Sequence, residues 1–446
     1  HTVGTVVPVP ANGSVARISL SLRLSRKVKE ILEGESFDVV HLHEPLPPSV
    51  GKPRPLLEVA DIFRAHGQAY RQVHVLRPEE RAAMRAIEVC RTQVLGGHVD
   101  VCTACDFSRP AYNSCRNRHC PKCQALTQAA WIDQRMERVL PTHYFHVVFT
   151  LPHELGRVAI HNREAMFDLL FASAARTLLT LGEDERRLGA QLGLTAVLHT
   201  WTRDQRFHPH VHCIVTGGGL AAARDRWVSC SQKFLFPVRV LSRLFRAKFL
   251  DGFASAYRRA ELDLSGLADL GEFDGLLDTL HRKPWVVYAK RPFAGPEQVF
   301  KYLGQYTHRV GLSNHRLVSF DERGVRFRTR DGKVAALPPE EFIRRFLLHV
   351  LPGGFVKIRH YGILASGNVR TKLADARRHL EVKEKAVAEP PRREPSWKDR
   401  FLALTGFDLT SCPRCGGEMI SRPLDERPLH PWAATLSPPP MFPDTS

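Results

Sequence analysis

Cysteines offer the clearest chemistry in this sequence of 446 residues, because six of the ten fall between residues 90 and 123. Two C-x2-C pairs lie within this stretch and are separated by 14 residues. Four thiolates at such spacing are typical of a tetrahedral structural zinc ion. We therefore expect a zinc ribbon whose metal is held by Cys102, Cys105, Cys120 and Cys123.

Four more candidate ligands lie in the same segment, and they could form a second zinc site with two cysteines and two histidines: Cys90, His98, Cys115 and His119. The alternative is that the basic and polar loop 114–119 contacts phosphate or packs locally. A further knuckle, Cys412-Pro-Arg-Cys415, is half of a site, because no second pair follows it.

Histidines dominate the segment 207–215, which alternates with the period of two that is typical of a β-strand. His208, His210 and His212 therefore lie on one face of that strand. Three imidazoles in register favour a divalent metal site with positions left open for substrate oxygens.

Two tyrosines, Tyr302 and Tyr306, are four residues apart, so in a helix their hydroxyls share one face. The same spacing also occurs in ordinary core packing, but Lys301 and Gly304 lower the apolar content here. A tyrosine hydroxyl has an unperturbed pKa of about 10 and is a poor nucleophile at neutral pH. A metal that polarises a phosphodiester makes its attack feasible, and the product is a covalent phosphotyrosine.

Taken in chain order, these motifs resemble those of rolling-circle HUH transposases of the insertion-sequence-91 type, over about residues 55–415. The resemblance rests on His210-Val-His212, on the tyrosine pair and on the segment 114–124, Ser-Cys-Arg-Asn-Arg-His-Cys-Pro-Lys-Cys-Gln. It implies an enzyme that cleaves single-stranded DNA and transfers the strand. One tyrosine would keep the 5′ end as a phosphotyrosine and release a 3′-OH, and the other would take the second cleavage.

Individual roles follow from the resemblance. His210 and His212 match the pair that holds Mg²⁺ or Mn²⁺, and His208 fits the local pattern as a further ligand. Tyr302 and Tyr306 match the two nucleophiles, and Gln305 is near enough in sequence to help the metal. The first cysteine set matches an N-terminal zinc-binding domain: Cys102, Cys105, Cys120 and Cys123.

The resemblance also implies an α+β fold, in which an antiparallel sheet of ferredoxin or RRM type carries the histidines and the tyrosine helix lies across it. A small zinc-ribbon-like domain would precede this nuclease core. The sequence patterns agree, since they predict strands at 142–151, 192–201, 207–215 and 285–290 and helices at 161–181, 234–262 and 296–307.

The domain organisation that we expect has five parts. Residues 51–135 form a helical and zinc-binding domain, 136–315 the catalytic domain, 316–380 a basic strand-rich extension, and 381–446 a tail rich in Pro and Arg. Residues 1–50 instead resemble the N-terminus of a family-4 glycosyltransferase of the mannosyltransferase branch, through Pro-Ala-Asn-Gly-Ser and Val-Val-His-Leu-His-Glu-Pro. The pattern predicts a helix over about 16–33 and a strand over 37–45.

The net charge of +18 favours a polyanionic partner. Between residues 281 and 370 there are 17 Lys and Arg against 6 Asp and Glu, and aromatic residues are interleaved with them, as suits single-stranded DNA. We expect the DNA of the element ends and of the target as partners, in the cytoplasm at the nucleoid. No apolar run approaches the ~20 residues of a spanning helix, so we expect no membrane partner, and no small-molecule substrate either.

Two other functions remain open from the sequence. One is a replication initiator or relaxase with the same nuclease core, against which the zinc motifs and the tyrosine pair argue. The other is a non-catalytic, zinc-dependent DNA-binding protein whose histidines hold a structural metal. A glycosyltransferase is the least favoured, since only about 50 residues resemble one.

Overall fold

The computed structural model describes residues 6–9, 13–18, 39–42, 57–136, 138–202, 204–264, 270–290, 312–321, 323–329, 332–381, 396–406 and 408–424. Tyr302, Gln305 and Tyr306 lie outside the described residues. The chain divides into two units, one formed by residues 1–56 and 395–411 and the other by residues 57–394 and 412–446.

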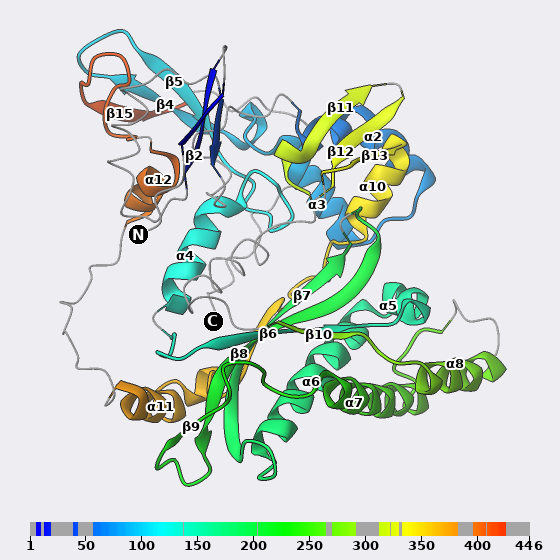
Figure 1. The fold of residues 1–446 in the computed structure, drawn as a ribbon. Coiled ribbons are helices and arrows are strands. Elements are labelled where there is room, and N and C mark those ends of the chain that lie inside the picture. The colour runs from blue at the N-terminus through cyan, green and yellow to red at the C-terminus, as the bar shows by residue number, and fades with distance from the viewer. Residues whose placement is uncertain are drawn as a thin grey trace. The chain divides into compact units, whose positions relative to one another are not determined.

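A six-stranded antiparallel sheet is the centre of the larger unit (Figure 1). Its strand order is β10-β6-β8-β7-β14, and β9 pairs with β8 off this path. The strands are β6 (Tyr144–Thr150), β7 (Ala190–Trp201), β8 (Phe207–Ala221), β9 (Trp227–Ser229), β10 (Val287–Lys290) and β14 (Ile358–Gly362). The four strands that the sequence patterns predict in this region are therefore present, and the fold is α+β with antiparallel sheets.

One face of this sheet is covered by α5 (Gly156–His161), α6 (Arg163–Glu183), α7 (Val238–Arg258) and α8 (Leu270–Arg282). The alternation along β6 and β8 points Val147, Phe149 and Val211 into this core, where they meet apolar side chains of α6 and α7. Among the described residues, α6 is the one helix long and apolar enough to cross a membrane. Its apolar side chains pack against the sheet, as in the core helix of a globular domain.

The opposite face of the sheet carries the histidines of β6, β7 and β8. Helix α4 (Gln124–Met136) covers part of this face, where Trp131 packs with Tyr144, Val197 and Ile214. The imidazoles therefore lie on the face that also carries Trp131 of α4, and not in the main core.

A second hydrophobic core joins residues far apart in the sequence. Helices α2 (Val59–Val73) and α3 (Pro78–Val89) pack with α10 (Pro339–Leu347) and a sheet of β11 (Leu317–Asp321), β12 (Gly324–Arg328) and β13 (Val334–Leu337). Phe63 and Phe346 meet edge to face, with ring centroids 5.2 Å apart. This core also takes in Cys90 and Cys120.

A third antiparallel sheet has the order β15-β4-β5, from β4 (Gly97–Cys102), β5 (Ser108–Tyr112) and β15 (Met419–Pro423). The other helices are α11 (Lys372–Glu381), in the larger unit, and α12 (Trp397–Thr405), in the smaller one. Short 3-10 helices span Gln93–Leu95, His153–Leu155, Asn314–Arg316 and Ser366–Asn368.

The smaller unit contains β1 (Val6–Val9), β2 (Gly13–Ile18) and β3 (Val39–Leu42). β2 pairs with β3 in parallel, so the strand predicted at 37–45 is present in part. The predicted helix over 16–33 is wrong at its start, because residues 16–18 belong to β2, and the rest of it lies outside the described residues.

The main core makes a direct prediction about stability. Phe245 is fully buried against Phe149 and Trp285. Truncation by Phe245→Ala removes these contacts and leaves a cavity, so we expect a cost of about 3–5 kcal/mol and a lower midpoint of thermal unfolding. Phe234→Ala is the matched control, because the Phe234 side chain is 56% exposed. Equal midpoints for the two variants would contradict the described core.

Candidate metal centres

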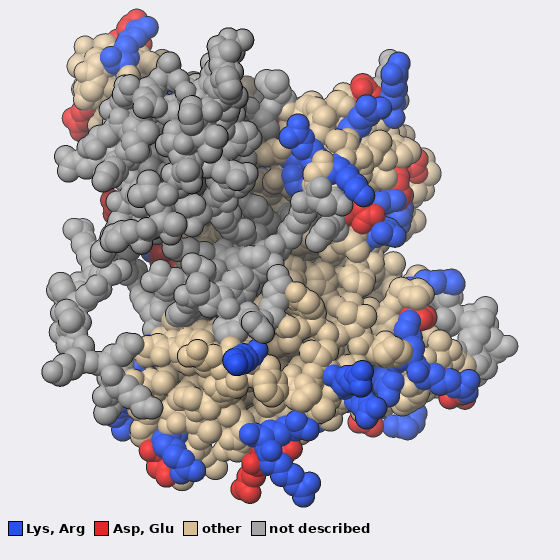
Figure 2. Space-filling view, viewed as in Figure 1, with Lys and Arg blue, Asp and Glu red and all other residues tan. Residues whose placement is uncertain are grey.

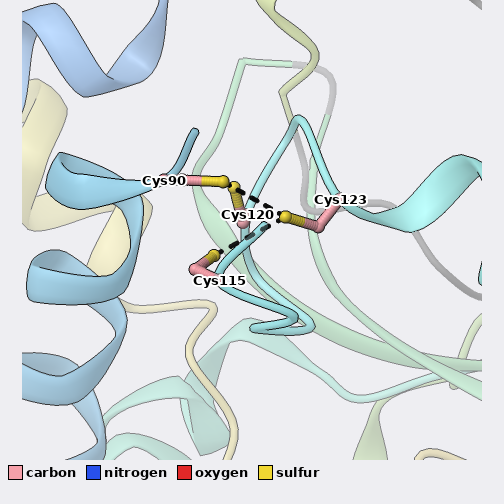
Figure 3. Close-up of side chains that lie close together, drawn as sticks. All are labelled: Cys90, Cys115, Cys120 and Cys123. Atoms are coloured by element: carbon pink, nitrogen blue, oxygen red, sulfur yellow. Dashed lines mark hydrogen bonds between the residues drawn. The ribbon is translucent and has the colours of Figure 1, made fainter. Parts of the chain in front are cut away.

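The first cysteine cluster consists of Cys90, Cys115, Cys120 and Cys123. Figure 3 shows the four thiols pointing toward one another. Cys90 follows the last residue of α3, and Cys123 directly precedes α4. The Sγ atom of Cys123 lies 3.2 Å from that of Cys90 and 3.6 Å from that of Cys115. Hydrogen bonds from Cys115, Cys120 and Cys90 lower the pKa of the Cys123 thiol.

The second cluster consists of Cys102, Cys105, Cys412 and Cys415. Its Sγ–Sγ distances are 3.5 Å from Cys102 to Cys415 and 3.8 Å from Cys105 to Cys412. Cys102 ends β4 and lies opposite Met419 of β15, and this strand pairing brings the two knuckles together.

The predicted grouping of the cysteines is therefore wrong. Cys102 and Cys105 do not meet Cys120 and Cys123. They lie in the first knuckle, at the turn of the β4–β5 hairpin, and β4 pairs with β15, which follows Cys412 and Cys415. The knuckle at Cys412 is not half of a site but completes one.

The predicted site with two cysteines and two histidines is also wrong, because Cys90 and Cys115 meet two cysteines and neither histidine. His98 lies on β4, with its Nε2 atom 3.3 Å from a carboxylate oxygen of Asp100. His119 is buried, and its Nε2 atom accepts a hydrogen bond of 3.4 Å from the backbone N–H of Leu351. Burial holds the pKa of His119 well below its usual value, which suits a neutral acceptor.

The sequence left open whether the loop 114–119 contacts phosphate or packs locally, and one of its two arginines packs locally. Arg118 points inward, and its guanidinium donates to the carbonyls of Phe355 (2.7 Å) and Pro352 (3.0 Å). Burial lowers the pKa of Arg118. Together with His119, Arg118 ties the first cysteine cluster to the segment that leads into β14.

Each cysteine cluster fits zinc on its donor chemistry. Each offers four sulfur atoms that all lie within 4.8 Å of one another, as tetrahedral coordination requires. A site whose ligands are all protein thiolates leaves no open position, so such zinc is structural.

Three histidines form a further candidate metal site on the face of the central sheet opposite α6 and α7: His199, His210 and His212. Antiparallel pairing places His199 of β7 directly opposite His210 of β8. One ring nitrogen from each residue lies within 4.8 Å of the others. The ring centroids of His199 and His212 are 4.2 Å apart, and those of His210 and His212 are 5.0 Å apart.

Hydrogen bonds orient two of these rings. The Nδ1 atom of His210 donates to the backbone carbonyl of His208 over 2.7 Å, which leaves the Nε2 lone pair of a neutral ring for a metal. The Nδ1 atom of His212 pairs with Nε2 of the buried His146 over 2.7 Å. Such partners are typical of metal-binding imidazoles, since they fix the tautomer and the ring orientation.

His208 does not join the group with its side chain, although the sequence pattern made it a candidate ligand. It contributes its carbonyl to His210 instead. His199 was missed by the sequence analysis. The alternation along 192–201 could have placed His199 on one face of a strand, but only the register between β7 and β8 shows that this face adjoins His210.

The edge of this site is aromatic and basic. The indole of Trp201 stacks on His199 with centroids 5.0 Å apart. The Nζ atom of Lys357 lies 5.0 Å above the Trp201 ring. Burial, with a smaller contribution from Arg118, lowers the pKa of Lys357 to about 7. Figure 2 shows further Lys and Arg side chains gathered over α7 and α8 and around β11 and β12.

Two family comparisons match this region and the cysteine segment. The family described as "Putative transposase" matches residues 193–372, which include all three clustered histidines. The family described as "Transposase zinc-binding domain" matches residues 62–151. A relative from Sinorhizobium fredii, "Putative transposase y4qJ", is 47% identical over 376 residues, which cover 82% of this chain and 94% of the relative. The chain belongs to the two-tyrosine transposases of the IS91 type.

Other relatives extend this result. The transposase is 27% identical over 402 residues to the transposase for insertion sequence element IS801 of Pseudomonas savastanoi, over 82% of this chain and 89% of the relative. Its N-terminus matches a phosphatidyl-myo-inositol mannosyltransferase of Propionibacterium freudenreichii at 51% identity over 49 residues, 11% of this chain and 13% of the relative. The resemblance seen in the first 50 residues is thus confirmed. No solved structure matches the transposase.

The histidine cluster makes a prediction about metal binding. We expect His199→Ala to weaken Mn²⁺ binding by at least about tenfold, because it removes one of three clustered imidazoles. His208→Ala is the control, since it keeps the carbonyl that orients His210. Isothermal titration of the purified transposase with Mn²⁺ checks both variants. Equal losses in the two variants would contradict the assignment of His199.

The inward orientation of Arg118 makes a second prediction. We expect Arg118→Met to lower the thermal unfolding midpoint, because two partly buried backbone carbonyls lose their hydrogen-bond donors. Arg116→Gln, an exposed position in the same loop, should leave the midpoint within about a degree or two. If Arg118 instead served only to contact phosphate, its loss would weaken DNA binding and leave the midpoint unchanged.

Proposed function

We propose that this transposase cleaves and rejoins single-stranded DNA by tyrosine attack assisted by a divalent metal. The observation that carries the proposal is the cluster of His199, His210 and His212 on adjoining strands, inside the segment that matches the transposase family. Three imidazoles leave coordination positions open, which distinguishes this site from the two cysteine clusters.

The strand that precedes the tyrosine segment in the chain supports this proposal. β10 ends at Lys290, which lies opposite His146 of β6 in the sheet register. His146 is hydrogen-bonded to His212. The chain therefore enters the segment that contains Tyr302 and Tyr306 from a strand end beside the histidine cluster.

The residues have separate tasks in the proposed reaction. His199, His210 and His212 would hold Mg²⁺ or Mn²⁺, and His146 would fix the orientation of His212. The metal supplies charge that polarises the scissile phosphate. The hydroxyl oxygen of one tyrosine attacks phosphorus, and the bond from phosphorus to the 3′ oxygen breaks. The 5′ end becomes a phosphotyrosine, and the proton lost by the tyrosine balances that gained by the 3′-OH.

The second tyrosine would perform the next cleavage in the same way, and a free 3′-OH would then attack a phosphotyrosine to rejoin the strands. Each exchange replaces one phosphodiester by another, so the reaction needs no nucleotide cofactor. The proposal includes an HUH-type nuclease core over 136–315, a DNA-binding zinc domain over 51–135, and element ends and target DNA as substrates, at the nucleoid in the cytoplasm.

The basic surface is consistent with a single-stranded substrate. In the described part of the segment 281–370, Arg326 and Arg328 lie on β12, Arg323 directly precedes it, and residues 344, 345 and 359 are also basic. Such groups neutralise phosphates along a strand while exposed aromatic rings stack on bases.

The proposed chemistry predicts a covalent product. Labelled single-stranded DNA from the element ends, incubated with the transposase and Mn²⁺, should give a protein–DNA adduct that survives denaturation. We expect Tyr302→Phe with Tyr306→Phe to abolish the adduct, and His212→Ala to reduce it by at least about tenfold. Tyr112→Phe is the control and should leave it unchanged.

Two outcomes of this assay would count against the proposal. An adduct that survives the loss of both tyrosines would contradict the assigned nucleophiles. Absence of any adduct with every divalent metal tested, while the protein still binds the DNA, would favour a non-catalytic DNA-binding protein.

A further inference from the structure

We propose that Cys102, Cys105, Cys412 and Cys415 hold a second structural zinc ion, which fastens the C-terminal knuckle to the N-terminal hairpin. The match to the transposase zinc-binding family ends at residue 151, so it does not extend to Cys412 and Cys415. The proposal rests on the geometry of the two knuckles and on the fact that none of the hydrophobic clusters among the described residues includes them.

The two knuckles share one backbone hydrogen-bond pattern, although they lie some three hundred residues apart. In the first, the N–H of Cys102 donates to the carbonyl of Phe107, five residues on, over 2.9 Å. In the second, the N–H of Cys412 donates to the carbonyl of Gly417, also five residues on, over 2.7 Å. Each turn thus presents two cysteines at equivalent positions, as the two halves of a four-thiolate site require.

Backbone N–H groups point at the sulfur atoms in both knuckles. Ala104 donates to the Sγ atom of Cys102, and Arg414 donates to that of Cys412, each over 3.4 Å. Gly417 donates to the Sγ atom of Cys415 over the same distance. Such donors stabilise the negative charge of a thiolate, which is the form that binds a metal.

Gly417 is required where the knuckles meet. A Cβ atom at this position would lie 2.8 Å from the Cβ of Ala104 and 3.2 Å from the Sγ of Cys102. The first knuckle is thus packed directly against the second. Thr103 completes the junction, because its backbone N–H donates to the carbonyl of Glu418 over 3.0 Å.

The three-stranded sheet that carries these knuckles has no hydrophobic core of its own. Among the described residues of β4, β5, β15 and the two knuckles, the buried ones are Asp100, Cys102 and Cys412, and none belongs to a hydrophobic cluster. A sheet this small needs a metal or disulfides to be stable. Because all four thiols lie together, zinc supplies what apolar packing does not.

The charges of the sheet balance, as suits a metal site whose role is structural. Residues 97–112 and 412–424 contain three arginines and three acidic residues. Two of these arginines are paired, Arg109 with Asp100 over 3.1 Å and Arg414 with Asp106 over 2.5 Å. A zinc ion at these four cysteines would crosslink two segments of the chain between which the whole six-stranded sheet lies. A truncated chain that ends before Cys412 cannot form this crosslink.

Cobalt substitution tests this inference with a readout that does not involve DNA. Thiolate-bound Co²⁺ gives a sulfur-to-metal charge-transfer absorption, to which a site of histidines does not contribute. The full-length protein, reconstituted with Co²⁺, should show twice the absorption of the double variant Cys412→Ser with Cys415→Ser. Cys115→Ser with Cys123→Ser should also halve it. Cys230→Ser, a cysteine outside both clusters, should leave it unchanged.

Amide hydrogen exchange distinguishes local loss of structure around the second cluster from a general loss of stability. In the double variant Cys412→Ser with Cys415→Ser, amide hydrogen exchange should accelerate in β4 and β15 while α2 and α3 keep their protection. The inference is overturned if this variant keeps the full charge-transfer absorption. It is also overturned if the native protein contains a disulfide between Cys102 and Cys415, detected as a linked peptide pair by mass spectrometry.

Discussion

The antiparallel register of β7, β8 and β6 is the constraint on which the candidate active site depends. It sets His199 opposite His210 and places His146 within 2.7 Å of His212. Because side chains alternate between the faces of a strand, a shift by one residue in either pairing would turn a histidine into the core under α6 and α7. The tightly packed core on that other face, with Val147, Phe149 and Val211, therefore holds the clustered histidines in place.

A short series of contacts connects the first cysteine cluster to the histidine site. Arg118 and His119, between two of its cysteines, bind the backbone at Leu351, Pro352 and Phe355. Within the same segment, the buried His349 pairs through Nδ1 with the hydroxyl of Thr200, next to His199, over 3.2 Å. A zinc ion at Cys90, Cys115, Cys120 and Cys123 would thus stabilise the loop that supports the edge of the histidine site, besides the domain that contains it.

Local patterns predicted much of this arrangement. Sequence patterns correctly gave the strands that carry His199, His210 and His212, and the C-x2-C spacing marked cysteines that do lie in clusters. What local patterns could not predict was pairing between distant segments. Three C-x2-C knuckles and four single cysteines can combine in several ways, and only the hydrogen bonds between β4 and β15 show that Cys102 meets Cys415. His199 was not predicted as a candidate ligand for the same reason, because the sequence does not show which strand pairs with β7.

The most direct test of the metal site is a crystal structure of the full-length transposase with Mn²⁺, with data collected at the manganese absorption edge. Anomalous scattering identifies the metal independently of any assumed ligand. We predict one manganese peak within bonding distance of ring nitrogens of His199, His210 and His212, with His146 hydrogen-bonded to His212. A manganese ion bound by His208 and His210 without His199 would contradict it.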